Sequence, residues 1–541
     1  MSATHDVFNV SKPLSGHNVV SDDAALVDAV RRHGGDSALD DLAKLGGQAG
    51  SAQARGWGEQ ANTRIPQLRT HDRFGHRIDT VDYDASYHAL MDAAVTHGLH
   101  AAAWSDPHPA AHVIRAAGFI AWSQVEAGHM CPISMTYAAV PALRADTALF
   151  EAWTPGLTAR HYDPHHVTSS QKSGLIAGMA MTEKQGGSDV RANTTTAVPD
   201  GDAYRLSGHK WFCSAPMSDV FLTLAHAPGG LTCFVVPRWL PDGTRNAIDI
   251  QRLKDKLGNR SNASAEIEYD SAVGYRLGEE GRGVRTIVEM VSATRLDCVL
   301  GSTAIMRAAL TEAIWHTSHR QAFGTTLIDA PLMRSVLADL ALDVEAATAL
   351  GMRLAAAVDT DTESERALRR IALPAAKLTV TKRAIIVTGE ALECLGGNGY
   401  VEESGMPRLY REAPVNSVWE GSGNVNALDL IRAMTREDDT ISALSDELDR
   451  AVGVDHRFDD ARRELLDTLR NPTDAHLQAR WLAERTAVLL QAALLLRYAP
   501  AAVTDAFIAT RVADYGARLP GTLPVGTDMT AIIDRSTPVP H

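Results

Sequence analysis

The most distinctive chemical feature of this 541-residue chain is a glycine-rich loop. In the stretch "GMAMTEKQGGSDV", residues 178–190, an apolar segment runs into Thr182 and is followed by two glycines, Ser188 and Asp189. Backbone N–H groups and hydroxyls would be displayed there with almost no side-chain bulk, so the loop can bind an anion or the polar edge of a flat ring. A plain turn between two strands is the alternative interpretation, and this segment alone leaves both open.

A second stretch, "PVNSVWEGSGN" (residues 414–424), places one carboxylate, Glu420, between Trp419 and a run of small residues. A purely structural Glu420 would be an acidic residue at the start of a helix, where the helix dipole favours negative charge. The local sequence leaves a chemical role for this carboxylate open.

Three further segments carry aromatic or glycine-rich patterns: "GHKWFCSAP" (208–216), "RQAFGTTL" (320–327) and "LECLGGNGY" (392–400). The first places Trp211 and Phe212 beside Ser214 in a predicted strand, where aromatic residues usually belong to the core. In the third, Gly396 and Gly397 are most simply a helix C-cap.

Several common site types are excluded because their motifs are missing. The sequence has no GxxxxGK[ST], no GxGxxG after a strand, no GxSxG and no HExxH, which argues against a P-loop enzyme, a Rossmann dehydrogenase, an α/β-hydrolase and a zincin. His161, His165 and His166 cluster in "RHYDPHHV", without a ligand pair at helical spacing or a nearby cysteine. We therefore expect a solvated loop there and no metal site.

Composition and charge narrow the class of protein. The chain is 45% hydrophobic and 22% charged, as in ordinary globular proteins, and its formal net charge of −14 argues against a surface that is basic throughout. We expect buried thiols in a reducing compartment, because the five cysteines form no CxxC pair. A cytoplasmic protein is expected, since no signal-peptide pattern and no membrane-spanning segment are found. The cysteines are Cys131, Cys213, Cys233, Cys298 and Cys394.

The spacing of apolar residues differs among three parts of the chain and predicts the helices and strands that position these segments. From about residue 87 to 144, apolar residues recur three and four apart, which predicts helices. Around residue 175, short β-rich runs separated by "PDGD", "PGG" and "PDGTRN" predict a compact antiparallel β domain. Helical spacing returns at Val284, and the charged connector 359–365 is predicted to start a new helix with Ser364 as its cap. The last twenty or so residues are rich in Pro, Gly and Thr, which predicts a C-terminal tail.

The predicted fold class is α+β and mostly helical, because strands and helices do not alternate as a doubly wound sheet requires. The length predicts more than one domain. We expect an N-terminal helical domain with an extension (1–174), a β domain carrying the glycine-rich loop (175–282), a helical bundle containing Glu420 (283–434) and an additional helical region (435–541).

Five motifs, in order and spacing, resemble those of the acyl-CoA dehydrogenases over about residues 80–434. "MTEKQGGSDV" resembles the flavin loop, "KWFCS" the second flavin strand, "RQAFG" the Arg-x-x-Phe-Gly motif, "CLGGNGY" the Gly-Gly-x-Gly-Tyr motif and "VWEGSGN" the catalytic segment. The resemblance implies the family's fold: a helical domain, a central antiparallel β domain and a C-terminal helical bundle. Longer strings, such as "RLKDKLGNRSNAS" (252–264), and the helical extension past Arg432 are similar to the AidB-type branch, linked to the adaptive response to DNA alkylation.

This resemblance implies an FAD-dependent oxidation of an acyl-CoA thioester at its α,β bond. Glu420 matches the base that removes the α-proton while the β-hydrogen leaves as hydride to flavin N5, in an apolar slot where desolvation raises the pKa of the carboxylate. The backbone N–H of Glu420 and a flavin ribityl hydroxyl would polarise the thioester carbonyl. Trp419 would help to form the slot.

The cofactor contacts carry over to matching positions. In the β domain, Ser214 corresponds to the hydroxyl that faces flavin N5, and Phe212 to the aromatic residue usually stacked there. The loop that lines the isoalloxazine ring and reaches the pyrophosphate corresponds to Met181, Thr182, Gly187 and Ser188. Ser422 and Asn424 correspond to family residues that contact the nucleotide portion of FAD. The family residues that reach the ADP half of FAD across a subunit interface correspond to Arg320, Phe323, Gly396 and Gly397. Trp419 is grouped with these cofactor-binding residues. Shared sites of this kind imply an obligate oligomer, commonly a homotetramer.

The sequence departs from the family pattern beside the pyrophosphate and at the CoA tail, and the resemblance also implies a DNA partner. Glu393 stands where most family members have glutamine beside the pyrophosphate, and a second anion there repels it unless Arg320 or a proton compensates. No residue set for the CoA tail emerges. The AidB-type branch implies binding of double-stranded DNA, for which Arg432, Arg511 and Arg518 are candidates, although a solvated face of mixed charge is an equal alternative. The alternative function is therefore a DNA-binding flavoprotein of the alkylation response with weak or no dehydrogenase turnover.

Overall fold

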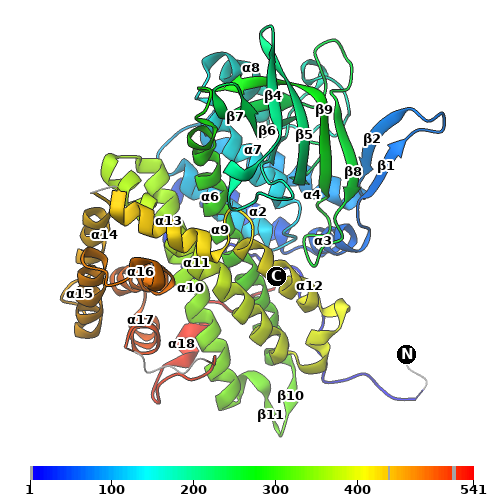
Figure 1. The fold of residues 1–541 in the computed structure, drawn as a ribbon. Coiled ribbons are helices and arrows are strands. Elements are labelled where there is room, and N and C mark those ends of the chain that lie inside the picture. Colours follow the sequence, from blue (N-terminus) through cyan, green and yellow to red (C-terminus); the bar gives the residue numbers. More distant parts are fainter. Residues whose placement is uncertain (1–3, 437–438, 514–518, 541) are drawn as a thin grey trace. The chain divides into compact units, whose positions relative to one another are not determined.

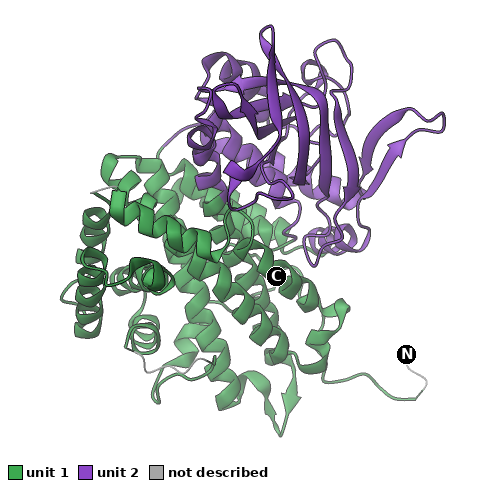
Figure 2. Ribbon diagram, in the orientation of Figure 1, with its two compact units in different colours: residues 1–52, 109–125, 295–541 green, residues 53–108, 126–294 purple. Residues whose placement is uncertain are grey.

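The structure is a computed structural model that describes residues 4–436, 439–513 and 519–540. The chain forms two compact units, which Figure 2 distinguishes by colour. Unit 1 comprises residues 1–52, 109–125 and 295–541, and unit 2 comprises residues 53–108 and 126–294. The finer division into four segments at residues 174, 282 and 434 stays a prediction.

Unit 2 is built around seven strands that form one sheet (Figure 1). The strands are β3 (Ala177–Ala180), β4 (Thr196–Asp200), β5 (Ala203–Ser214), β6 (Val220–Ala227), β7 (Gly230–Pro237), β8 (Ile248–Leu253) and β9 (Ser264–Leu277). Their order is β3-β6-β4-β5-β9-β7, β8 pairs with β9, and β7 pairs back onto β6, so the sheet closes on itself. The predicted antiparallel pairing is confirmed for most pairs, but β6 runs parallel to β3 and β4.

The interior of this sheet is filled by apolar side chains that include Phe221, Phe234 and Ile267. β6 and β7 are buried along nearly their whole length, which explains their continuous apolar runs "VFLTLAHA" and "LTCFVVP". Helices complete unit 2: α3 (Ala52–Thr63), α4 (Ala85–Thr96), α5 (Ala102–Ser105), α7 (Met130–Leu143) and α8 (Thr147–Leu157).

A two-stranded hairpin, β1 (Gln67–His71) and β2 (Arg77–Asp82), lies within the segment predicted to be helical. The hairpin was not predicted because β1 alternates exposed with half-buried residues, and β2 buries one apolar residue, Val81, beside the buried Asp79, so the apolar signal is weak. The guanidinium of Arg77 donates to the carbonyl of Ile250 at 3.0 Å, which attaches the hairpin to β8.

Unit 1 is a helical bundle in which α11 contacts α10, α13, α14 and α16 (Figure 1). α9 (Gly283–His319) begins with residues of unit 2 and continues in unit 1. The other elements are α1 (Ala24–Arg32), α2 (Leu39–Ala49), α6 (Ala111–Ser123), β10 (Gln321–Ala322), β11 (Thr325–Thr326), α10 (Pro331–Thr360), α11 (Glu363–Cys394), α12 (Met406–Glu412), α13 (Gly423–Arg436), α14 (Asp439–Asp449), α15 (His456–Arg470), α16 (Ala475–Tyr498), α17 (Ala501–Phe507) and α18 (Met529–Asp534).

Two local predictions in unit 1 are wrong. The cap of α11 is Thr362, whose hydroxyl accepts from the N–H of Glu365 at 3.3 Å, whereas Ser364 lies inside the first turn. The predicted C-terminal tail contains α18, which buries Ile532 and Ile533. Packing against the bundle makes this segment ordered in spite of its Pro, Gly and Thr content.

The predicted buried thiols are confirmed, because all five cysteines are free and buried. Within the described ranges, no helix combines the length and apolar character needed to cross a membrane.

Candidate active site

The Glu420 segment forms a tight turn between two helical elements of unit 1. A 3-10 turn ends at Ser417, and α13 begins at Gly423. Between them, Glu420 has a φ of 57° and Gly421 a φ of 94°, so both residues adopt left-handed backbone. Glu420 is half-buried. Because this conformation costs a non-glycine residue about 1–3 kcal/mol, it persists only where the surroundings hold it, and it marks Glu420 as a candidate functional residue.

A buried lysine holds the two carbonyl groups that flank Glu420. Nζ of Lys377, on α11, donates to the carbonyl of Trp419 at 2.6 Å and to the carbonyl of Gly421. Lys377 is only 1% exposed, and burial lowers its pKa although the nearby Cys298 and Glu420 oppose that shift. One side chain therefore fixes both neighbours of Glu420 and lies near enough for its charge to interact with the carboxylate.

An arginine and an amide complete the support of this turn. Nε of Arg295, on α9, donates to the carbonyl of Glu420 at 3.0 Å. Its Nη1 donates to Asp429 at 2.6 Å, so the guanidinium is itself anchored. The amide of Asn426 donates to the carbonyl of Gly421 at 2.6 Å. Three consecutive carbonyls thus point toward donors, and this arrangement explains why the left-handed backbone is stable.

The indole of Trp419 is also fixed in place. Its Nε1 donates to Oδ1 of Asn416 at 3.0 Å, and the Asn416 amide donates to Ser302 at 3.1 Å. Trp419 is half-buried. The indole is therefore held in one orientation in the residue next to Glu420, and its part in an apolar slot stays a prediction.

In unit 2, a buried ion pair anchors the glycine-rich loop. The carboxylate of Glu183 accepts from Nζ of Lys210 at 2.8 Å, from the hydroxyl of Thr195 at 2.6 Å and from the N–H of Thr194 at 2.6 Å. Both charged side chains are fully buried. Burial alone would raise the pKa of Glu183, but the lysine and these hydrogen bonds lower it to about 2. The loop is thus attached to β5 through charge as well as backbone.

The two ends of this loop are fixed, and its tip is exposed. The amide of Asn193 donates to the carbonyl of Met181 at 2.9 Å, and the N–H of Trp211 donates to the carbonyl of Thr182 at 2.7 Å. Residues 187–189 are exposed to solvent. The geometry matches an anchored loop with backbone N–H groups and hydroxyls at its tip.

The end of β5 presents one aromatic ring and one hydroxyl beside this loop. Phe212 is 48% exposed, so the usual expectation of a core aromatic does not hold for it. Trp211 lies beneath Lys254, whose Nζ is 3.1 Å from the ring centroid. Oγ of Ser214 lies 3.1 Å from Oγ of Ser264 on β9.

The residues expected to reach the ADP half of FAD lie on exposed positions of unit 1. Phe323 stands at the tip of the β10–β11 hairpin with 106% exposure and a left-handed φ of 53°. Arg320 donates to the carbonyl of Asn9 at 2.6 Å and is half-buried. A fully exposed phenylalanine in strained backbone needs an explanation beyond the folding of this unit.

The glycine-rich end of α11 is also open. Gly396 has a φ of 60° directly after the last residues of the helix, which confirms the C-cap interpretation. A Cβ at Gly396 or Gly397 would meet nothing within 4 Å. Glu393 is exposed nearby, and the pKa of Glu390 is raised by burial and by the negative charge of Glu393.

The positions after Glu420 are held within unit 1. Ser422 is half-buried and its carbonyl accepts from the Asn426 amide at 3.0 Å. Asn424 is exposed, and its Oδ1 accepts from Nη1 of Arg480 on α16 at 2.9 Å. The additional helical region therefore contacts the segment 414–424 through Arg480, and this contact was not predicted from the sequence.

The three DNA-binding candidates differ in environment. Arg432 is exposed on α13, whereas Arg518 lies outside the described residues. Arg511 belongs to a π-helical turn, is mostly buried and pairs with Asp339 and with Asp343 at 3.2 Å. Its charge is compensated inside the bundle, so Arg511 no longer supports the DNA-binding hypothesis.

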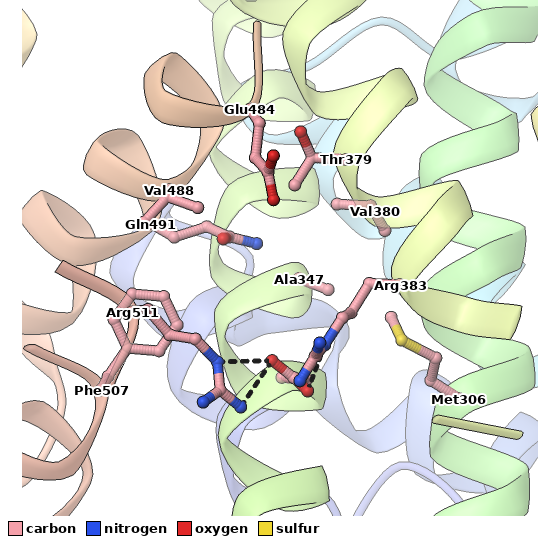
Figure 3. Close-up of a pocket in the computed structure, with 11 residues that line it drawn as sticks. Met306, Ala347, Thr379, Val380, Arg383, Glu484, Val488, Gln491, Phe507 and Arg511 are labelled. Carbon is pink, nitrogen blue, oxygen red and sulfur yellow. Dashed lines mark hydrogen bonds and ion pairs between the residues drawn. The ribbon is translucent and has the colours of Figure 1, made fainter. Parts of the chain in front are cut away.

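A cavity of about 80 Å³ lies beside Arg511, and Figure 3 shows its lining. Asp343 accepts hydrogen bonds there from Arg383 at 2.6 Å and from Arg511 at 3.2 Å. Since the carboxylates neutralise both guanidinium groups, this cavity lacks the net positive charge of an anion site.

The histidine cluster shows no metal-like geometry. Across the described ranges, no group of three or more His, Cys, Asp or Glu side chains is arranged to hold a metal ion. His165 pairs with Asp163 at 2.7 Å, and burial lowers the pKa of His166 to about 4.

Four charged residues that support the candidate site were not predicted from the sequence: Glu183, Lys210, Arg295 and Lys377. For Lys377 a local signal exists, because this charge stands within the apolar run "LPAAKLTV". Lysine and glutamate are almost never fully buried unless paired, so a charge embedded in such a run indicates a partner elsewhere in the chain.

Comparison with known proteins covers nearly the whole chain. Residues 9–164 match the adaptive response protein AidB N-terminal domain, residues 178–272 the acyl-CoA dehydrogenase middle domain and residues 281–435 the acyl-CoA dehydrogenase C-terminal domain. The chain is 47% identical to AidB of Escherichia coli (strain K12) over 509 residues, covering 93% of this chain and 94% of that protein. It is 32% identical to acyl-CoA dehydrogenase family member 11 of Caenorhabditis elegans, over 81% of this chain and 74% of that protein.

Solved structures agree with these sequence matches. The crystal structure of Caenorhabditis elegans ACDH-11 in complex with C11-CoA superimposes with a TM-score of 0.86 at 28% identity, covering 98% of this chain and 95% of that chain. The expected fold, with helical N- and C-terminal domains around a middle β domain, is thereby confirmed. The chain belongs to the acyl-CoA dehydrogenase family of FAD-dependent flavoproteins, as an AidB-like member.

Proposed function

We propose that the protein is an FAD-dependent dehydrogenase that oxidises an acyl-CoA thioester at its α,β bond, with Glu420 as the general base. The observation that carries this proposal is the left-handed backbone of Glu420, held by Lys377 and Arg295, at the position of the family's catalytic carboxylate. A structural acid at a helix start needs neither strained backbone nor two cations on adjacent carbonyls.

The described residues fit an FAD cofactor. The exposed loop tip at 187–189 offers N–H groups and hydroxyls, and Phe212 offers a half-exposed aromatic face. The open space at Gly396 and Gly397 lets a ligand approach the backbone closely. When bound, FAD accepts the hydride from the β-carbon. The residues proposed to hold it are Met181, Thr182, Gly187, Ser188, Phe212 and Ser214 in unit 2, and Arg320, Phe323, Gly396, Gly397, Trp419, Ser422 and Asn424 in unit 1.

In the proposed reaction, the Glu420 carboxylate removes the α-proton of the thioester. The backbone N–H of the same residue polarises the thioester carbonyl, where negative charge develops as the proton leaves. Lys377 and Arg295 keep this backbone rigid, so that carboxylate and N–H hold a constant geometry. Trp419, fixed by Asn416, excludes water from one side of the carboxylate.

The substrate is proposed to be an acyl-CoA, and a medium-length straight chain is the first to test. The reason is the relative from Caenorhabditis elegans, which was crystallised with C11-CoA and covers 98% of this chain. The panel should also include short, branched and long acyl chains, because no described residue set identifies the chain length.

The decisive experiment is an anaerobic titration of the holoprotein with this acyl-CoA panel, following flavin absorbance. We expect bleaching by at least one acyl-CoA. Glu420→Gln should retain FAD but bleach about 10²- to 10⁴-fold more slowly, the usual effect of removing a general base. Glu363→Gln is the matched control, since Glu363 is an exposed acid in the first turn of α11.

Bleaching of the Glu420→Gln protein at the wild-type rate would exclude Glu420 as the base. If no acyl-CoA bleaches a wild-type flavin that dithionite still reduces, the dehydrogenase proposal fails.

A DNA-binding flavoprotein of the alkylation response is the second candidate. The observation in its favour is that Arg432 and Arg436 are both exposed, one turn apart on α13. Phosphate contacts by such a pair would weaken steeply with salt. Reversing both charges to Glu should abolish duplex binding at low salt, whereas Arg276→Glu, on an exposed position of β9, should not. Absence of wild-type binding at low salt would exclude this candidate.

We also propose a homotetramer, as the family resemblance implies. The support is Phe323, whose complete exposure at a hairpin tip is unusual for a monomer and would be relieved by a partner subunit. Light scattering after size-exclusion chromatography should give about four chain masses. A monomeric wild-type protein at micromolar concentration would contradict it.

A further inference from the structure

An N-terminal arm, residues 4–13, lies along the end of α9 within unit 1. Nε1 of Trp315 donates to the carbonyl of Lys12 at 2.7 Å. One turn position further along the helix, Nδ1 of His316 lies 3.0 Å from the hydroxyl of Ser11. The arm therefore runs in the direction opposite to α9, toward the β10–β11 hairpin that follows this helix.

Asn9 pairs with the outer edge of that hairpin. The N–H of Gln321 donates to Oδ1 of Asn9 at 2.7 Å, and Nδ2 of Asn9 donates to the carbonyl of Gln321 at 2.9 Å. In an antiparallel pair, alternate residues direct their N–H and C=O away from the partner strand. Gln321 is such a residue, because the next ladder bond joins the N–H of Leu327 to the carbonyl of Arg320 at 2.8 Å. Asn9 thus occupies the place of a third strand at this edge.

The direction of each hydrogen bond made by Asn9 is fixed by its partner. A peptide N–H can only donate and a peptide carbonyl can only accept, so one orientation of the Asn9 amide satisfies both groups of Gln321. Nη1 of Arg320 donates to the carbonyl of Asn9 at 2.6 Å, and a guanidinium has no acceptor. Asn9 therefore makes three hydrogen bonds to two consecutive residues of the Arg-x-x-Phe-Gly motif.

The conformation of Asn9 sets it apart from the rest of the arm. Its φ is 56°, in the left-handed region that asparagine adopts more readily than most residues. Asn9 is half-buried, whereas the neighbouring Val7 and Phe8 are 73% and 81% exposed. Near the hairpin, the arm therefore contributes hydrogen bonds and little buried apolar area.

The hairpin itself is too short to hold its conformation firmly. β10 and β11 contain two residues each, and an isolated two-stranded hairpin is marginally stable in water. Its tip carries the fully exposed Phe323 in left-handed backbone. Hydrogen bonds from Asn9 to the edge of β10 restrict the conformations that this hairpin can adopt.

We propose that Asn9 is a positioning residue that holds Arg320 and the β10–β11 hairpin in the conformation that binds the ADP half of FAD. This inference rests on the proposed function, which assigns Arg320 and Phe323 to that half. An arginine side chain has five N–H donors, so the bond to Asn9 leaves donors for a phosphate. A hairpin that is ordered before the cofactor arrives raises the binding-competent fraction and thus lowers the apparent Kd for FAD.

The test compares FAD with FMN, which has the same ring system but lacks the AMP part of FAD. The full-length protein is stripped of flavin and titrated with each cofactor. We expect Asn9→Gly to raise the Kd for FAD about three- to tenfold, because two hydrogen bonds to the hairpin are lost. The Kd for FMN should stay within about twofold, since FMN has no part that reaches the hairpin.

The substitution by glycine keeps the left-handed backbone and the carbonyl that accepts from Arg320, so it removes only the side-chain contacts. Asp6→Gly is the matched control, because Asp6 is exposed in the same arm. It should leave the Kd for both cofactors within about twofold of wild type. Melting temperatures of both variants verify that they are folded.

A wild-type Kd for FAD in Asn9→Gly, or an equal loss of affinity for FAD and FMN, would overturn the inference. Both results leave the proposed function intact. If the wild-type protein binds FAD no more tightly than FMN, or binds no FAD, the assignment of the hairpin to the ADP half fails, and the proposed function is contradicted together with this inference.

Discussion

Two turns, one in each unit, are each supported by a buried lysine, but the lysines have different partners. In unit 2, Lys210 pairs with the carboxylate of Glu183 and anchors the loop by charge neutralisation. In unit 1, Lys377 donates to the backbone carbonyls of Trp419 and Gly421. The acid of that turn, Glu420, belongs to the segment that is held.

This difference shows how one residue type can serve two roles. An ion pair with a carboxylate lowers the pKa of the acid and makes it unreactive as a base, as the value of about 2 for Glu183 illustrates. A lysine bound to carbonyls stabilises the backbone instead. Glu183 is therefore held through its carboxylate, whereas the turn of Glu420 is held through its backbone carbonyls.

The largest expected effect is that of Lys210→Met. It leaves Glu183 buried without its cation, which costs about 3–5 kcal/mol of unfolding free energy. Urea unfolding of the purified protein measures this loss. Lys184→Met, at an exposed position of the same loop, is the control and should change stability by less than about 0.5 kcal/mol. A loss below 1 kcal/mol for Lys210→Met would remove the contrast between the two lysines.

Lys377→Met should have a smaller effect on stability and a larger one on catalysis. The carbonyl of Trp419 loses its donor, which costs about 1–3 kcal/mol, and Glu420 can relax from its left-handed backbone. We expect kcat for the acyl-CoA found by titration to fall by at least about tenfold while KM changes by less than about threefold, because positioning of the base matters in the transition state.

The control for that experiment is Lys382→Met, a half-buried lysine further along α11. If both variants lose equal activity, or if Lys377→Met changes only KM, the carbonyl contacts do not position the base.

Acid should destabilise the glycine-rich loop through Glu183. The pKa of this carboxylate is about 2 in the folded protein and 4.5 without these contacts, so the unfolded chain takes up the proton first as pH falls. The stabilisation is present above about pH 4.5 and is lost between there and about pH 2. Urea midpoints at pH 5, 4 and 3 should fall less for Glu183→Gln than for wild type. If the urea midpoints of Glu183→Gln and wild type fall equally with pH, the Glu183 carboxylate is not the group that acid titrates.

The smallest expected effect concerns the contact between the additional helical region and the segment 414–424. Arg480→Ala removes the hydrogen bond to the exposed Asn424 and should cost less than about 1 kcal/mol. Urea unfolding and FAD content measure the outcome. A loss above 2 kcal/mol, or release of FAD, would show that the catalytic turn depends on α16 as well as on Lys377.

Much of the site was predictable because its motifs are local. The left-handed turn at Gly396, the exposed loop tip and the isolated acid in "VWEGSGN" follow from residue types within a few positions. Predictions failed where packing overrode composition. The Pro- and Thr-rich end of the chain forms α18, because Ile532 and Ile533 find a surface of the bundle to cover.

Local pattern was sufficient to identify the fold class and the glycine-rich loop, since each depends on neighbours in the chain, whereas Glu420 was singled out as the candidate base by the family resemblance. It could not pair Lys377 with Trp419, 42 residues away, or Lys210 with Glu183, 27 residues away. Such partners are set by how helices and strands pack, and a buried charge carries no local record of which group satisfies it. The supports of both turns arise only in the folded chain.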